Sequence, residues 1–206
     1  DLRQGGTWMG VARTGRFAAI TNYRDPTQVL PSAPSRGQLV SDYLCGAESA
    51  YVYLNRLVPK ARDYNGFNLV LGDADGLFYY SNRADQWRTL APGLYGLSNH
   101  LLDTPWPKLE RGRNALRNLL DRQVDLVPDE LLELLMDRTP VPDSDLPHTG
   151  VSLVWERWLS PIFIDAPGYG TRSSTALLVS DSRQACMVET TWTDASRREF
   201  QLDWRA

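Results

Sequence analysis

The chain has 206 residues, of which 42% are hydrophobic and 10% aromatic, so it is long enough to bury a substantial core. Its formal net charge of −3 gives no bulk attraction to nucleic acid or to an anionic membrane, and no apolar run reaches the roughly 20 residues that a transmembrane helix needs. The two cysteines, Cys45 and Cys186, are far apart and form no CxxC pair, which predicts neither a zinc site nor a disulfide framework and favours a reducing, cytoplasmic compartment.

The first half of the chain alternates between strand and helix patterns. Residues 5–23 predict a β-hairpin, because two runs of alternating side chains flank a turn at Thr14 and Gly15. Asp73 to Gly76 predict a second tight turn, between GFNLVLGD and GLFYYSN, and Ser35 is expected to cap a helix. The remaining elements are predicted, in chain order, as a loop at 25–35, helices at 36–44 and 49–58, and strands at 66–73, 76–82 and 93–99.

The second half begins with helices and ends with strands. Its elements are predicted as helices at 107–124 and 128–136, a loop or linker at 139–150, a short helical stretch at 151–159, and strands at 174–180, 185–192 and 198–204, with turns at 181–182 and 194–195. The order of strands, helices, strands, helices and strands indicates a single α+β domain over residues 1–206, with mostly antiparallel sheets and helices on their outer faces.

The segment AAITNYRDP presents an unusual strand end. An apolar run reaches Ile20 and then gives way to Asn22, Tyr23, Arg24 and Asp25, which are an amide, a phenol, a guanidinium and a carboxylate. An asparagine at a strand end often closes an Asx-turn, and Arg24 with Asp25 would form an ion pair that stabilises such a turn. The alternative is that these polar side chains form the floor of a functional site.

Several motifs occur in a fixed order along the chain: GGTWMGV, TNYRDP, SRGQLV, YNGFNLVLGD, YYSN, GLYGLSNHLLDTPWPK and YGTRSSTALLV. Together they resemble the NRDE family, whose eukaryotic members are called transport and Golgi organisation protein 2, and the resemblance covers essentially the whole chain. It implies a fold like that of the N-terminal-nucleophile hydrolases, a four-layer αββα sandwich of helix, sheet, sheet and helix.

Family members begin with Met-Cys and carry an Asn-Arg-Asp-Glu motif soon after it. This sequence begins with Asp1, just before GGTW, and contains neither feature. The resemblance therefore implies an N-terminally truncated domain that lacks the nucleophile. It also leads us to expect an exposed strand edge or an unfilled cleft beside residues 7–23.

An enzyme of this type needs an attacking thiol or hydroxyl, a free α-amine that takes its proton, and fixed donors that hold the oxyanion. The conjugated bile salt hydrolase and penicillin V acylase branch of the fold is similar to this chain in three short places, at TNY, SN and GTRSST. That similarity implies catalytic roles for Asn22, Asn99 and Arg172. Arg172 could instead pair with Asp165 or Glu189.

Residues beside these positions are candidate ligand-binding groups, namely Tyr23, Arg24 and His100. Neither Cys45 nor Cys186 has a histidine close in sequence, so an internal catalytic cysteine is not expected, and both are interpreted as buried packing residues. No metal and no resident cofactor are predicted.

The resemblance implies three alternative functions. The first is a cysteine amidohydrolase or acyltransferase that acts on a small amide or acylated molecule. The second is a non-catalytic carrier, since family members have been linked to haem trafficking and acyl-lipid handling. Haem would then be a carried ligand, and we expect this chain to ligate it weakly or not at all, or else through His100 as the axial ligand. The third is an organising role, as the Golgi name suggests. The expected partner is a small molecule and not nucleic acid, in the cytoplasm or, in a eukaryote, associated with the Golgi or mitochondria.

Overall fold

The computed structural model describes residues 4–122, 125–182 and 184–203. Contacts divide the chain into two compact units, which meet in sequence between Thr104 and Pro105. The elements of the first unit are β1 (Met9–Val11), β2 (Phe17–Asn22), η1 (Pro26–Gln28), α1 (Arg36–Cys45), α2 (Ala50–Leu57), η2 (Val58–Asp63), β3 (Phe67–Asp73), β4 (Gly76–Ser81) and β5 (Gln86–Leu90).

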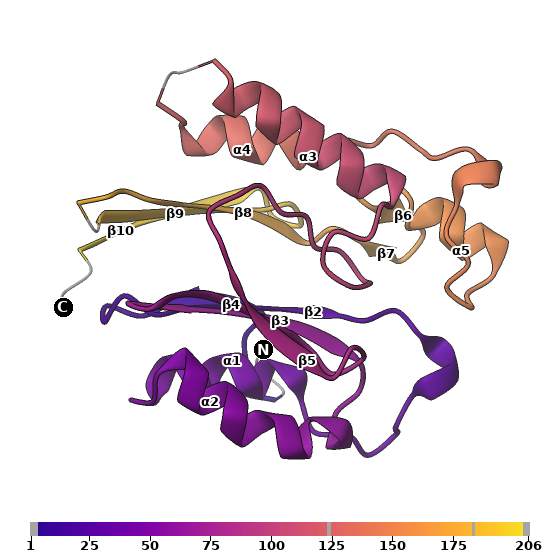
Figure 1. The fold of residues 1–206 in the computed structure, drawn as a ribbon. Helices are drawn as coiled ribbons and strands as arrows, with labels where there is room; N and C mark the ends of the chain where they lie inside the picture. Colours follow the sequence, from indigo (N-terminus) through magenta and orange to yellow (C-terminus); the bar gives the residue numbers. More distant parts are fainter. Residues whose placement is uncertain (1–3, 123–124, 183, 204–206) are drawn as a thin grey trace. The chain divides into compact units, whose positions relative to one another are not determined.

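The first unit is built on one antiparallel five-stranded sheet, in the strand order β1-β2-β3-β4-β5. Helices α1 and α2 lie against one face of this sheet (Figure 1). Because side chains alternate across a strand, Ile20, Leu69 and Tyr80 point towards these helices and are buried there. Their neighbours in sequence, including Asn68 and Tyr79, lie on the opposite face.

Arg16, in the turn between β1 and β2, fastens this hairpin to the end of α1. Its side chain is only 8% exposed, and its guanidinium donates hydrogen bonds to the carbonyl oxygens of Tyr43, Gly46 and Glu48. It also stands over the Tyr43 ring, 4.2 Å from the centroid. The last carbonyls of a helix lack partners within the helix and carry its negative dipole end, so a buried cation is favourable at this place.

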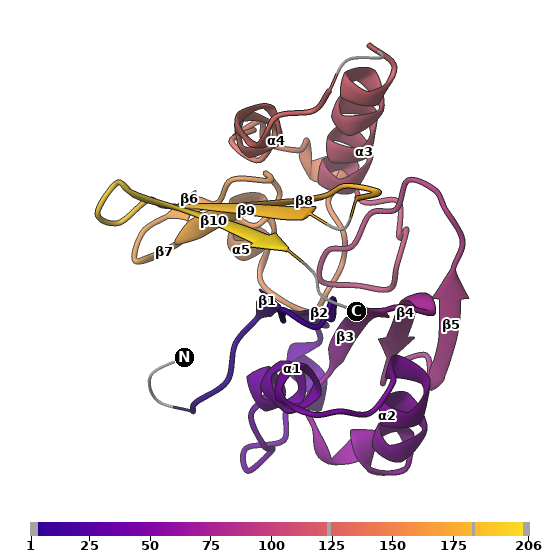
Figure 2. The same ribbon diagram turned by 90° about the vertical axis from the view of Figure 1, so that its left-hand side faces the viewer.

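The second unit contains the remaining helices and a smaller sheet. Its elements are α3 (Pro107–Leu120), α4 (Pro128–Leu134), η3 (Asp143–Asp145), α5 (Leu153–Trp158), β6 (Asp165–Ala166), β7 (Tyr169–Gly170), β8 (Ser173–Val179), β9 (Gln184–Thr191) and β10 (Ser196–Asp203). The antiparallel sheet has the order β10-β9-β8, and β6 pairs separately with β7. Figure 2 shows α3 and α4 side by side over one face of this sheet, where Leu132 packs on Ala176 and Val188.

Most of the predicted elements are confirmed, as are the mixed α and β composition and the antiparallel sheets. Ser35 occupies the predicted N-cap position of α1, although its side chain makes no capping hydrogen bond. The predicted helix at 107–124 ends at Leu120, and residue 124 lies outside the described residues. The short hairpin of β6 and β7, which turns at Gly168 with φ of 73°, was not predicted.

The predicted strand at 93–99 is wrong. The fifth strand of the sheet is β5, after a turn in which Asp85 has a φ of 54°, and residues 91–104 form a loop. Strand β1 lies at one edge of this sheet and pairs only with β2 among the described residues.

Replacing Arg16 by alanine should lower the free energy of unfolding by about 3 kcal/mol, because three carbonyl groups lose a charged donor. Denaturant unfolding of the purified protein measures this change. Arg62→Ala is the matched control, because Arg62 is 81% exposed in its ion pair with Asp85 and should change stability by less than about 0.5 kcal/mol. Equal effects of the two substitutions would contradict the role given to Arg16.

Candidate functional site

A polar network forms where the end of β2 meets the loop at 96–104. The Thr21 hydroxyl donates to the Ser98 carbonyl oxygen at 2.9 Å, and the Arg24 main-chain N–H donates to the carbonyl of Asn99 at 2.7 Å. The Asn99 side-chain amide donates to the main-chain oxygen of Asn22 at 3.1 Å. These bonds join positions more than seventy residues apart and fix the loop along the strand end.

Asn68, in the middle of the sheet, is the residue that holds this loop. It is fully buried, and its amide donates to the Thr21 hydroxyl at 3.1 Å and to the His100 carbonyl at 2.9 Å. Its side-chain oxygen accepts from the Tyr79 hydroxyl at 2.8 Å, and that hydroxyl in turn accepts from the Leu102 N–H at 3.0 Å. Sequence reasoning missed Asn68 and Tyr79; the available signal was one amide within an otherwise apolar strand run.

His100 is held at both ring nitrogens. Nε2 lies 2.7 Å from the Tyr23 hydroxyl and Nδ1 lies 2.8 Å from the Thr104 hydroxyl. The Thr104 hydroxyl donates its own proton to the Leu101 carbonyl, so Nδ1 is the donor and Nε2 accepts from Tyr23. Burial lowers the pKa of His100, which favours the neutral ring that this arrangement contains. Burial, and next the charge of Asp25, raise the pKa of Tyr23.

The Asn22 side chain has no hydrogen-bond partner among the described residues. Its Oδ1 is buried without a hydrogen-bond partner, and its amide nitrogen makes no hydrogen bond with any described residue. The Asx-turn interpretation of Asn22 is therefore wrong: Asp25 closes that turn, and its carboxylate accepts from the main chain of Thr27 at 3.1 Å. Asn22 pairs with Phe67 across the strands and so lies on the helix-covered face of the sheet, away from Asn68.

The predicted site residues thus fall into two groups. Asn22, Tyr23, Arg24, Asn99 and His100 are brought together by the network, and Arg24 Nη2 also lies 3.4 Å from the Asn99 side-chain oxygen. The sixth predicted site residue, Arg172, belongs to the second unit.

Arg172, just before β8, is exposed, and its guanidinium makes no ion pair within the described part of the chain. The partners considered for it are engaged elsewhere. Asp165 pairs with Arg138 at 2.6 Å, and Glu189 accepts from the Thr175 hydroxyl at 3.2 Å. The ion-pair alternatives for Arg172 are therefore wrong.

The cysteines differ from their predicted burial. Cys45 is exposed at the end of α1, and Cys186 is half-buried, with its sulfur accepting from the Gln201 amide at 3.1 Å.

Over the described residues there is no group of three or more His, Cys, Asp or Glu side chains that could hold a metal ion. None of the helices in that part of the chain is long and apolar enough to cross a membrane.

The described residues define an α+β protein with antiparallel sheets and a polar network at a strand end. The chain belongs to the transport and Golgi organisation 2 family, also called the NRDE family, because the model of that family matches residues 1–194.

Named relatives agree with this assignment. The chain is 33% identical to the Transport and Golgi organization protein 2 homolog of Bos taurus over 221 residues, which covers 97% of this chain and 79% of the relative. The Homo sapiens homolog is 34% identical over 205 residues, covering 93% and 74%. Transport and Golgi organization protein 2 of Drosophila melanogaster is 26% identical over 211 residues, with the same coverage.

Substituting Asn68 by alanine should lower the free energy of unfolding by about 2–4 kcal/mol, since the Thr21, Tyr79 and His100 groups lose a buried partner. The loop should loosen as well, so hydrogen exchange of the Arg24 and Leu102 amides should accelerate. Asn118→Ala, at an exposed position of α3, is the control. Unchanged exchange at Arg24 and Leu102 would show that Asn68 does not hold the loop.

Acidification should weaken the fold through His100. Its pKa in the folded chain is lowered, so below about pH 6.5 the unfolded chain binds the proton first and the free energy of unfolding falls. The stabilising contribution is complete above about pH 6.5 and is lost as the pH falls through the folded pKa. Comparing denaturant midpoints of the wild type and His100→Gln across this range isolates the effect. An NMR titration midpoint of His100 at or above about 6.5 would contradict it.

Proposed function

We propose that this chain acts on a small molecule with an amide or acyl carbonyl, as a cysteine amidohydrolase or acyltransferase of the N-terminal-nucleophile type. The observation that carries the proposal is the uncommitted amide of Asn22, which sits at a fixed strand end with a buried, unpaired oxygen. Buried polar groups in proteins nearly always have partners, so one without a partner in the unliganded chain requires an explanation. A bound amide would supply one, because its N–H can donate to the Asn22 oxygen.

In this proposal Asn22 donates its side-chain N–H to the oxygen of the reacting carbonyl. Its main chain is already held by Asn99, so the donor is in place before negative charge develops on that oxygen. Asn99 is then a positioning residue, because its own amide donates to Asn22 and its oxygen faces Arg24. Tyr23 and His100 lie on the loop side of the strand end, so a ligand that contacts them as well as Asn22 would have to extend around the end of β2.

The covalent step follows from the same proposal. A thiol gives its proton to a free α-amine as its sulfur attacks the carbonyl carbon, and the α-amine passes that proton to the leaving amine. Water then hydrolyses the thioester, which releases the acid and restores the thiol. Cys45 and Cys186 contact no base among the described residues, so the nucleophile is assigned to the mature amino end of the intact protein. In this proposal Arg172 keeps the catalytic role implied by the family resemblance, as a group that neutralises negative charge.

A second candidate is non-catalytic carriage of an acyl lipid. A cavity of about 520 Å³ in the second unit supports it, since ligand sites of this size are lined mainly by apolar and aromatic groups. Its walls include Val154, Trp158 and Phe163, and also the charged side chains of Arg138, Arg157 and Asp165. Haem carriage has less support, because a bond from His100 to iron would first have to displace Tyr23 from Nε2.

A panel of N-acyl amides incubated with the intact protein tests the first candidate, with released amine as the readout. Asn22→Ala should lower kcat by about 10²–10³-fold with little change in KM, because the donor acts mainly on the developing oxyanion. The matched control, Asn118→Ala, should leave both constants unchanged. Turnover that survives Asn22→Ala would contradict the role of Asn22.

The same preparation separates the two candidates. A carrier would bind a fluorescent fatty acid without releasing any product, and Trp158→Ala would weaken that binding while Asn22→Ala would not. Absence of both turnover and lipid binding would refute both candidates.

A further inference from the structure

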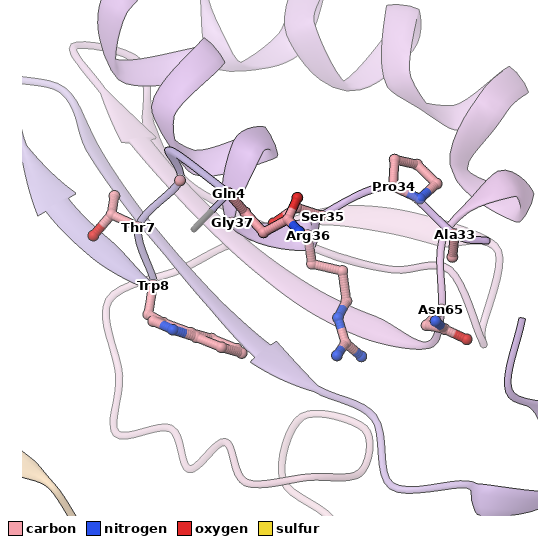
Figure 3. A pocket seen from close by; sticks show the side chains of 10 residues that line it. Gln4, Thr7, Trp8, Ala33, Pro34, Ser35, Arg36, Gly37 and Asn65 are labelled. Carbon is pink, nitrogen blue, oxygen red and sulfur yellow. The ribbon is translucent and has the colours of Figure 1, made fainter. Parts of the chain in front are cut away.

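A cavity of about 290 Å³ lies in the first unit, between the segment that leads into β1 and the start of α1 (Figure 3). Thr7 and Trp8 line it from the first segment, Ser35 and Arg36 from the second, and Asn65 from the chain before β3. Trp8 and Arg36 extend to the same side in this view.

The wall of this cavity is held by close backbone contact. The Thr7 N–H donates to the Gly37 carbonyl at 3.2 Å, and a side-chain carbon at Gly6 would lie 2.4 Å from the main chain of Gly37. Only glycine at position 6 allows the two segments to approach so closely. This contact within the chain itself therefore holds the wall of the cavity in place.

Arg36 is the one charged group among the described residues that line the cavity. Its Nη1 donates to the Gly66 carbonyl at 2.9 Å, and no carboxylate in the described part of the chain pairs with it. Burial lowers the pKa of Arg36, but a guanidinium remains charged at neutral pH. A partly buried cation loses hydration, and without a counter-ion nothing compensates this cost, so binding of an anionic ligand beside it is favourable.

The remaining groups indicate which kind of anion fits. Because Nη1 of Arg36 donates to the Gly66 carbonyl, the edge formed by Nε and Nη2 is the one that can bind a ligand. A carboxylate can accept two parallel hydrogen bonds from this edge. The Trp8 side chain is 52% exposed and offers a flat apolar face. The Ser35 hydroxyl makes no hydrogen bond with a described residue and supplies a further donor.

We propose that this cavity binds a small planar carboxylate, whose charged group pairs with Arg36 and whose flat body packs on Trp8. The volume is at the lower end of ligand sites in proteins, which limits the ligand to a single small ring or a body of similar size. This assignment is independent of the carbonyl chemistry proposed for Asn22.

NMR titration of the intact protein with benzoate tests the proposal, with the Trp8 indole N–H signal as the readout. Benzoate should shift this signal, whereas benzamide, its neutral counterpart, should bind at least about tenfold more weakly, since the charge-assisted pair is absent. Arg36→Gln should weaken benzoate binding by about tenfold or more. The control Arg117→Gln, at an exposed position of α3, should leave it unchanged.

Because Arg36 also bonds to Gly66, its substitution could affect the fold, so thermal unfolding is followed in parallel. Trp8→Ala, at a half-exposed position, provides a second test and should weaken benzoate binding several-fold with no loss of stability. Equal binding of benzoate and benzamide, or no effect of either Arg36→Gln or Trp8→Ala, would overturn the proposal. Tighter binding of phenyl phosphate than of benzoate would overturn the choice of carboxylate in favour of a phosphate ester.

Discussion

The buried amide of Asn68 is the constraint on which the strand-end network depends. An amide in the middle of a sheet is costly unless each of its hydrogen-bonding groups finds a partner, and Asn68 finds them in Thr21, Tyr79 and the carbonyl of His100. Two of these partners belong to neighbouring strands, and the third belongs to the loop. The loop cannot leave the sheet without exposing a buried unpaired donor, so sheet and loop form a cooperative unit.

Sequence patterns were sufficient to predict those elements whose conformation depends on residues close together in the sequence. The turn at Asp73–Gly76 depends on residues within the turn, and the Asp75 N–H bonds to the carboxylate of Asp73 at 2.9 Å. The strand expected at 93–99 is instead a loop, which is closed locally by hydrogen bonds between Gly96 and Asp103. Bonds to Thr21 and Asn22, 77 positions away, also hold it, and the periodicity of the sequence cannot reveal them.

The family resemblance located the strand-end residues but did not assign their roles. Asn22 and Asn99 are both asparagines at matched positions, and from the sequence they are equivalent donors. In the structure Asn99 donates a side-chain hydrogen bond to the backbone, whereas the Asn22 side chain donates none to a described residue. The difference arises from strand geometry, because the main-chain oxygen of Asn22 faces the loop while its side chain faces the helices.

The carbonyl of Gly66 connects the strand end with the cavity at Arg36. Its oxygen accepts both the Tyr23 N–H, at 2.9 Å, and Nη1 of Arg36. A side-chain carbon at Gly66 would lie 3.0 Å from Tyr23 Cβ and 2.7 Å from the Arg83 guanidinium, so only glycine fits this position without displacing a neighbour. Because one acceptor serves both donors, a movement of Arg36 alters the bond that fixes Tyr23, the residue next to Asn22.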